Sequence, residues 1–143
     1  MRSQAAGYSG TPLPRKLGIR AGQRIAFLDA PPAFAEALGE LPEGVGGPRA
    51  SLRGGPLDLV VAFFVERKAL ERRLPRLIAA LDPAGALWIA WPKRAARVET
   101  DLTEDVVREL GLAAGVVDVK VCAIDATWSG LKLVIRVKDR RPV

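Results

Sequence analysis

Two continuous apolar runs stand out along the chain, and an amphipathic segment separates them. The first run covers residues 59–65, and the second covers residues 86–91. Strands of a parallel sheet are buried on both faces, so they read as continuous apolar runs rather than alternating ones. The order predicts a strand, a helix and a second strand within an α/β sheet that helices cover on both faces.

The segment between the two runs has the periodicity of a helix. Arg72, Arg73 and Arg76 fall on the side opposite its apolar face. Pro75 predicts a kink because it removes one backbone hydrogen bond. The sequence Asp-Pro-Ala-Gly at residues 82–85 predicts the end of the helix. Its apolar face consists of Leu70, Leu74, Leu77, Ile78 and Leu81.

A shorter strand and helix precede this unit. Residues 24–30 predict a strand, and Pro31 and Pro32 predict a helix start, since proline is tolerated in a first turn. Residues 39–56 hold six glycines and three prolines, which leaves room only for a short strand at about residues 49–52. We expect residues 1–12 to form a mobile N-terminal arm and residues 13–143 to form a single domain.

The C-terminal third predicts a helix and a strand hairpin. Asp101 and Glu104 have the spacing of a capping box, and Gly111 or Gly115 ends the helix. Period-two alternation then predicts two antiparallel strands, with the last one either at the sheet edge or inserted within it. The alternating apolar positions are Val117, Val119, Val121 and Ala123 in the first strand, and Leu131, Leu133, Ile135 and Val137 in the second.

Composition excludes several kinds of chemistry. The 143 residues include no histidine, which excludes an imidazole base, a His-activated nucleophile and a His-bearing metal site. The one cysteine, Cys122, excludes an internal disulfide and fits a reducing compartment as a buried, inert thiol. There is no membrane-length apolar stretch and no secretory signal, so we expect a cytoplasmic protein without a membrane partner. The residues suggest no catalytic group and no metal site.

The net charge of +6 comes from 22 basic against 16 acidic residues. Such a balance is typical of a protein that binds nucleic acid, and equally of an arginine-rich surface without a polyanionic partner. We expect a monomer or a homodimer. The basic residues that would form a nucleic-acid surface are Arg72, Arg73, Arg76, Lys93, Arg94, Arg97, Arg136, Lys138, Arg140 and Arg141.

The predicted order of elements resembles class I S-adenosylmethionine-dependent methyltransferases, in which an antiparallel strand inserts into an otherwise parallel sheet. The segment LIAALDPAGALWIAWPK is similar to the helix, Pro-Gly turn and strand of those enzymes. The resemblance implies a Rossmann-like α/β fold, a three-layer sandwich whose mostly parallel sheet ends in an antiparallel strand hairpin.

The same resemblance implies a cofactor turn that this chain lacks. In those enzymes the first strand leads into an acidic-Gly-x-Gly-x-Gly turn, whereas residues 27–33 hold Asp29, Pro31 and Pro32 and no glycine. Proline also removes amide donors from the start of the following helix. We therefore expect no cofactor.

Longer motifs resemble a bacterial family known only as a domain of unknown function. This resemblance implies a stand-alone bacterial domain of this size, and it brings no known activity with it. The motifs are GYSGTPLPRKLGI, WPKRAA, TDLTEDVVRELGL and KVCAIDATWSGLKLVIR.

Candidate ligand-binding residues follow from a rule for open α/β sheets, in which ligands bind outside the carboxyl ends of the strands. In one interpretation, Trp91 stacks on a base of the ligand while Lys93 and Arg94 hold a phosphate. In the other, Trp91 packs at the rim of the sheet and the two basic residues are solvated. Asp125 reaches the same rim or bonds its own turn. The predicted site residues are Asp29, Glu66, Trp91, Lys93, Arg94, Asp125 and Trp128.

Without histidine or a glycine-rich turn, the sequence favours a non-catalytic ligand-binding or interaction protein. Two alternatives stay open: a nucleic-acid-binding protein that uses its basic surface, and a divergent S-adenosylmethionine-dependent methyltransferase. The state of the crevice at the strand ends distinguishes a ligand-binding protein from a scaffold without a site. In a scaffold, the crevice would be filled by the side chains of Pro31, Pro32, Phe34 and Trp91.

Overall fold

A computed structural model describes residues 10–45 and 48–140, so most of the predicted arm, residues 1–9, lies outside the described residues. The helices are α1 (Leu13–Leu17), α2 (Pro32–Leu38), α3 (Arg67–Ala79) and α4 (Glu104–Ala113), with 3-10 turns η1 (Arg94–Ala96) and η2 (Val137–Asp139). The strands are β1 (Ile25–Leu28), β2 (Leu57–Phe63), β3 (Leu81–Pro92), β4 (Val116–Ala123) and β5 (Trp128–Ile135).

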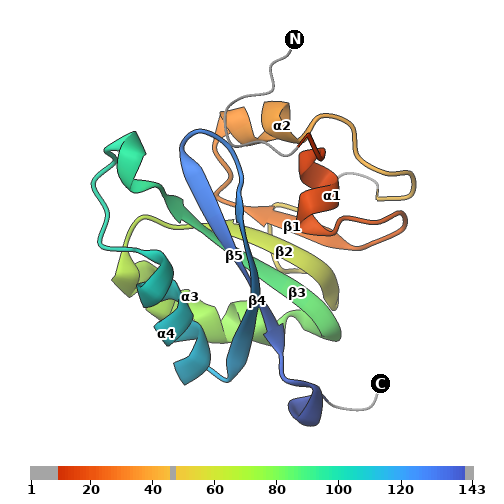
Figure 1. Cartoon of the computed structure of the whole chain (residues 1–143). Helices are drawn as coiled ribbons and strands as arrows, with labels where there is room; N and C mark the ends of the chain where they lie inside the picture. Colours follow the sequence, from red (N-terminus) through yellow and green to blue (C-terminus); the bar gives the residue numbers. More distant parts are fainter. Residues whose placement is uncertain (1–9, 46–47, 141–143) are drawn as a thin grey trace.

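The strands form one sheet in the order β1-β2-β3-β5-β4. β1, β2 and β3 are parallel, and β5 runs antiparallel between β3 and β4. Helices α1 and α2 lie on one side of the sheet and α3 and α4 on the other (Figure 1). The prediction of a Rossmann-like α/β sandwich is confirmed, and the last strand takes the inserted position.

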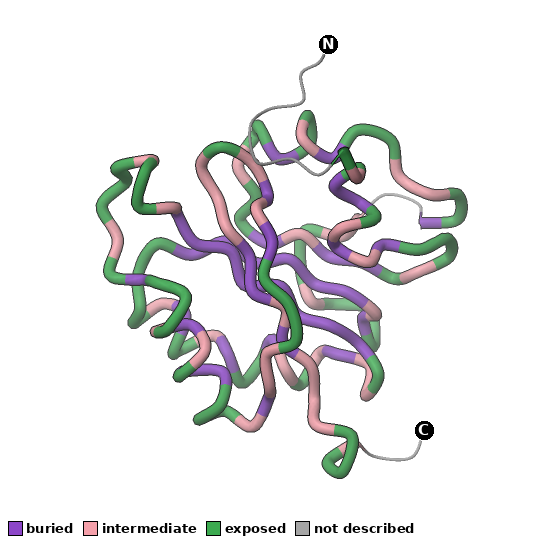
Figure 2. Tube along the Cα trace, viewed as in Figure 1, coloured by how far each residue is buried: buried purple, intermediate pink, exposed green. Residues whose placement is uncertain are grey.

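Alternate residues of the central strands pack in two separate hydrophobic cores, one on each face of the sheet. In β2, Val60 and Ala62 pack with the residues of α3 and α4, whereas Val61 and Phe63 pack with those of α1 and α2. A strand that is apolar on both faces satisfies both layers at once. The buried residues follow the middle strands in Figure 2 and thin out toward the hairpin.

The predicted strand at residues 49–52 is reduced to a single bridge at the sheet edge. Arg49 pairs in parallel with Ala26 of β1, through the bonds Arg49 N–H to Ile25 O (2.9 Å) and Phe27 N–H to Arg49 O (2.8 Å). The chain thus leaves β1 outward to Arg49 and then returns past β1 to form β2 on its other side. Strand order reverses between β1 and β2.

Helix α3 ends two residues earlier than its apolar pattern predicts. Leu81 pairs with Leu57 as the first residue of β3, so it is buried as part of a strand and not of the helix. Pro75 lies inside α3 on its exposed side. The break in the hydrogen-bond ladder therefore faces solvent rather than the core.

The capping box predicted from Asp101 is wrong. The residue that caps α4 is Thr103, whose Oγ1 accepts a hydrogen bond from the Val106 N–H at 3.2 Å. Asp101 instead accepts from the backbone N–H of Arg67 at 2.7 Å and so satisfies a donor at the start of α3. Asp101 thus ties the start of α3 to the segment that leads into α4.

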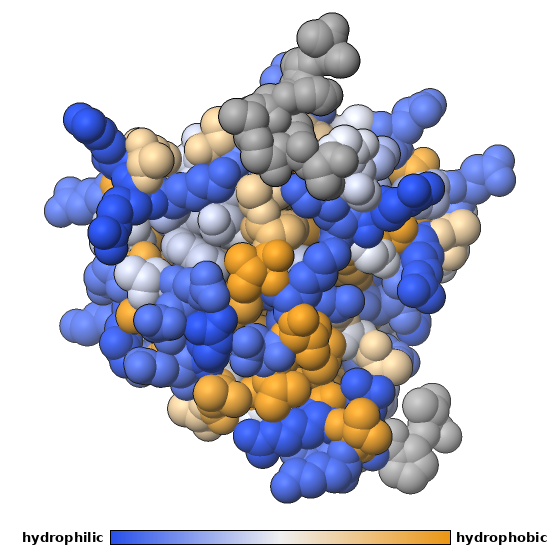
Figure 3. All heavy atoms as spheres, in the orientation of Figure 1, coloured by the Kyte–Doolittle hydropathy of each residue, from blue (hydrophilic) through white to orange (hydrophobic). Residues whose placement is uncertain are grey.

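The alternation predicted for the first hairpin strand is also wrong. An irregularity between Asp118 and Lys120 shifts the register of β4, so Val119 and Val121 are exposed while Cys122 is buried. A bulge adds one residue and turns the following side chains to the opposite face. Apolar atoms accordingly reach the surface over β4 (Figure 3). In the second strand, Leu131 and Leu133 are buried as expected, whereas Val137 lies in η2, 75% exposed.

Candidate functional site at the carboxyl ends of β1 and β2

The reversal of strand order between β1 and β2 places a hollow where open α/β sheets bind ligands. The hollow measures about 320 Å³ and opens between the carboxyl ends of these strands and the first turns of α3. Three predicted site residues, Asp29, Glu66 and Trp128, line it together. The other lining residues are Phe63, Phe64, Val65, Ala69 and Arg73.

Asp29 follows β1 directly and has an unusual backbone conformation, with φ at 56°. This left-handed region favours glycine and is tolerated by Asp and Asn better than by most other residues. The Asp29 carboxylate accepts a hydrogen bond from Arg73 Nη1 at 2.9 Å, and the Arg73 guanidinium lies 5.9 Å from the centre of the Phe64 ring. The Asp29 side chain is largely exposed, at 66%, and the Arg73 side chain is partly exposed, at 42%.

Trp128 forms the aromatic wall of the hollow. Its ring packs edge-on against Phe63 with centroids 5.1 Å apart, in a row that continues to Phe34 and Phe27. Asp125 holds this wall in place, since its Oδ1 accepts from the backbone N–H groups of Thr127 and Trp128, both at 2.8 Å. Asp125 is therefore the turn-forming residue of the hairpin and positions Trp128.

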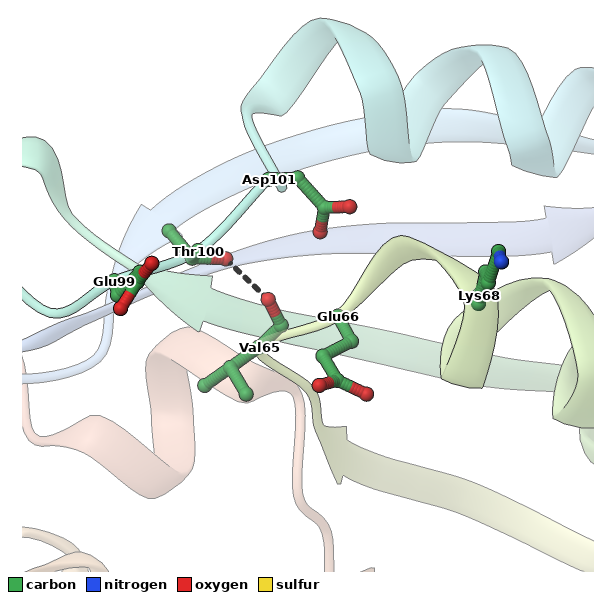
Figure 4. Close-up of a pocket in the computed structure, with 6 residues that line it drawn as sticks. All are labelled: Val65, Glu66, Lys68, Glu99, Thr100 and Asp101. Atoms are coloured by element: carbon green, nitrogen blue, oxygen red, sulfur yellow. Dashed lines mark hydrogen bonds between the residues drawn. The ribbon is translucent and has the colours of Figure 1, made fainter.

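Glu66 stands between this hollow and a second one of about 640 Å³. The second hollow is lined by Val65, Glu66, Lys68, Glu99, Thr100 and Asp101 (Figure 4). Thr100 Oγ1 donates to the carbonyl of Val65 at 2.6 Å, so two of the lining residues are bonded to each other. In Figure 4 the Glu66 side chain points away from Thr100 and Asp101.

The structure places the remaining predicted residues outside the Asp29–Glu66–Trp128 hollow. Trp91 is only 6% exposed and belongs to the core under α3 and α4. It therefore packs inside the protein and is not available to stack on a ligand base. The Lys93 backbone N–H donates to Thr127 O at 2.7 Å, and Arg94 begins η1. Trp91 thus packs on the α3 and α4 side of the sheet, whereas Phe34 packs on the other side, in the aromatic row that ends at Trp128. The hollow stays open between Asp29, Glu66 and Trp128.

Sequence reasoning missed Arg73 as a site residue. It assigned Arg73 to a solvated helix face, yet Glu66, Ala69 and Arg73 follow one another at helical spacing and line one side of the hollow. Residues three and seven positions apart share a helix face. That spacing, counted from a predicted site residue, was the signal that could have found Arg73.

Other reactive groups lie away from the hollow. Burial raises the pKa of the Cys122 thiol, which agrees with an inert side chain rather than a nucleophile. Within residues 10–45 and 48–140, no cluster of Asp, Glu and Cys has the arrangement of a metal site. In the same part of the chain, no helix is long and apolar enough to cross a membrane.

The Rossmann-like fold of the chain is shared by solved S-adenosylmethionine-dependent methyltransferases. The chain is similar to magnesium protoporphyrin IX methyltransferase from Synechocystis, solved with S-adenosylmethionine bound, at 12% identity over 87% of this chain and 74% of that one (TM-score 0.58). It is also similar to an S-adenosylmethionine-dependent methyltransferase from Aquifex aeolicus, at 14% identity over 85% and 87% of the two chains (TM-score 0.57).

A third similar structure is the CcbJ methyltransferase from Streptomyces caelestis, at 9% identity over 94% of both chains (TM-score 0.55). A scan against protein-family models finds no match, and neither does a search of curated protein sequences. At these identities the structural likeness shows the fold.

The comparisons contradict the interpretation of the chain as a non-catalytic ligand-binding or interaction protein. The Synechocystis neighbour was solved both with S-adenosylmethionine and with S-adenosylhomocysteine, and the Aquifex and Streptomyces neighbours are methyltransferases. That interpretation rested on the absence of glycines from the turn after β1. In the structure, Asp29 takes a left-handed φ of 56° at the start of this turn.

The side chains around the hollow match the groups of S-adenosylmethionine in charge and hydrogen-bonding character. Its amino-acid end carries one carboxylate and one ammonium group, which match the exposed Arg73 and Asp29 side chains. Its ribose hydroxyls are donors suited to a carboxylate such as Glu66, and its adenine is a flat ring suited to Trp128. Pro31 and Pro32 provide no amide donors, so side chains rather than backbone amides would hold this cofactor.

Proposed function

We propose that the chain is a divergent S-adenosylmethionine-dependent methyltransferase acting in the cytoplasm. One observation carries the proposal: at the reversal of strand order, a hollow brings Asp29, Glu66, Arg73 and Trp128 together. This is the position at which α/β sheets bind nucleotide-like ligands, and about 320 Å³ lies within the usual size of a small-molecule site.

Each side chain has a distinct role in this proposal. Asp29 and Arg73 bind the two charged groups of the amino-acid end, which replaces their mutual 2.9 Å contact with paired contacts to ligand. Glu66 accepts hydrogen bonds from the ribose, and Trp128 packs against the adenine. Asp125 is a positioning residue, since it acts only by fixing the turn that carries Trp128.

The bound cofactor would supply a methyl group made electrophilic by its sulfonium sulfur. The protein contributes orientation, because methyl transfer depends on aligning the acceptor with that group. The chain has no histidine to remove a proton from the acceptor. A proton lost by the acceptor would therefore pass to another base, such as a carboxylate, or to water.

Intrinsic fluorescence tests the proposed adenine contact. Trp88 and Trp91 are buried, whereas Trp128 is half-buried at the hollow, so a ligand there changes the emission of Trp128 alone. We expect titration with S-adenosylhomocysteine to quench the wild type and to leave Trp128→Phe unchanged. Quenching that survives in Trp128→Phe would place the ligand elsewhere.

A charge variant tests the amino-acid end separately. Asp29→Asn keeps a residue that tolerates the left-handed backbone and removes only the charge. We expect it to bind S-adenosylhomocysteine about tenfold more weakly, equal to about 1.4 kcal/mol. Glu109→Gln is the matched control, because Glu109 is exposed on α4 and lines none of these hollows. Equal affinities for both variants would contradict the role of Asp29.

A further inference from the structure

A third hollow, of about 720 Å³, lies on the other side of Arg73, between α3 and the segment that pairs with the edge of β1. Four arginines surround it, and none of its lining residues is acidic. The lining residues are Leu28, Ala50, Ser51, Leu52, Arg53, Arg72, Arg73 and Arg76. We call this cavity the arginine hollow.

The wall opposite α3 is held by specific contacts. Arg49 is paired with β1 through its backbone, and its Nη1 donates to the carbonyl oxygens of Arg53 (3.1 Å) and Gly54 (3.2 Å). Gly54 has a φ of 97°, and a Cβ there would lie 3.0 Å from Arg49 Nη1. Arg49 is thus used to shape the loop that carries Arg53 to the hollow.

The positive charge of the arginine hollow is largely uncompensated. Arg73 pairs with Asp29, but Arg53, Arg72 and Arg76 make no ion pair with any residue in the described ranges. Arg72 and Arg76 are also one helical turn apart, a spacing at which like charges repel. An arrangement that gathers unpaired guanidinium groups around one cavity suits an anion, and arginine binds phosphate through two parallel N–H donors.

The other basic residues do not extend this cavity into one surface. Arg94 and Arg97 follow β3 at one end of the sheet, whereas Arg136, Lys138 and Arg140 follow the antiparallel β5 at the opposite end. A nucleic acid would need a continuous basic stripe. The concave, separate arginine hollow favours a small ligand instead.

We propose that the arginine hollow binds a small organic molecule with at least two phosphate groups. Arg72 and Arg76 bind the phosphates from the helix side and Arg53 binds them from the loop side. Leu28 and Leu52 provide an apolar floor for the organic part. The site is distinct from the proposed cofactor hollow, with which it shares Arg73, and it does not depend on the methyltransferase proposal.

Calorimetric titration of the full chain with ADP and with pyrophosphate, without S-adenosylmethionine, tests the proposal. We expect both to bind, and Arg72→Ala/Arg76→Ala to bind each at least tenfold more weakly. Arg15→Ala/Lys138→Ala is the matched control, since both residues are exposed and lie outside the arginine hollow. It removes the same charge and should retain wild-type affinity.

Three results would overturn the proposal. The first is no binding of either ligand to the wild type. The second is an equal loss of affinity in both double variants, which would show only a response to net charge. The third is binding of a short single-stranded RNA by a chain that ignores ADP and pyrophosphate, which would assign the arginines to nucleic acid. Unchanged melting temperatures in both variants establish that the comparison is between folded proteins.

Discussion

Among single residues, Asp29 has both an unusual backbone conformation and a side chain in the proposed site. It takes a left-handed φ of 56° at the end of β1, and from there its carboxylate reaches Arg73. An aspartate adopts this conformation at lower cost than a β-branched residue does. The residue therefore has a structural role that can be separated from its charge.

Substitution of Asp29 by valine isolates the structural role. We expect Asp29→Val to lower the free energy of unfolding by about 1–2 kcal/mol relative to Asp29→Asn, because valine is strained at positive φ. Urea unfolding of the two variants measures the difference. Equal stabilities would show that the turn relaxes to an ordinary backbone conformation.

Part of the candidate site could be predicted from the sequence. Asp29, Glu66 and Trp128 were predicted from the rule that ligands bind at strand ends, and the structure brings them to one hollow. Trp91 was placed there by the same rule but faces the core, because strand residues alternate between faces and Trp91 shares its face with Ile89. Position along a strand predicts an edge of the sheet but not which face a side chain takes.

At the scale of elements, long periodic segments were predictable and short or irregular ones were not. The apolar run of β2 and the helical spacing in α3 each repeat over enough residues to define a period. The five residues of α1 are too few to do so, and the bulge in β4 depends on its pairing with β5. The arginine hollow escaped prediction because it requires the bridge between Arg49 and β1.

The start of α4 gives a test at this scale. Thr103→Ala removes the side-chain acceptor that caps the first turn of α4 by receiving the Val106 N–H. We expect a loss of about 1 kcal/mol in the free energy of unfolding, which is typical for an N-cap threonine. Chemical denaturation measures it. A neutral substitution would show that the Thr103 hydrogen bond does not stabilise this helix.

At the scale of the whole molecule, two ion pairs link stability to pH. Hydrogen bonds from Arg24 lower the pKa of Asp58, and those from Arg108 lower the pKa of Asp118. A carboxyl whose pKa is lower in the folded state stabilises that state above its ordinary value of about 3.9. This contribution is lost as the pH falls through the lower, folded-state pKa.

We therefore expect the melting temperature to fall as the pH is lowered below about 4, and Asp58→Asn to show a shallower dependence. Arg24 and Asp58 are partly exposed, so the effect of this one pair is small and is screened by salt. Thermal unfolding from pH 7 to pH 3 at low ionic strength measures both curves. Parallel curves would show that the Arg24–Asp58 pair does not contribute.

In the proposed function, the chain holds S-adenosylmethionine through side chains, without a glycine-rich turn. Calorimetric titration of the wild-type chain with S-adenosylmethionine tests it most directly. We expect saturable binding of one molecule per chain, with a matching rise in melting temperature at excess ligand. The absence of both heat and thermal shift at millimolar S-adenosylmethionine would contradict it.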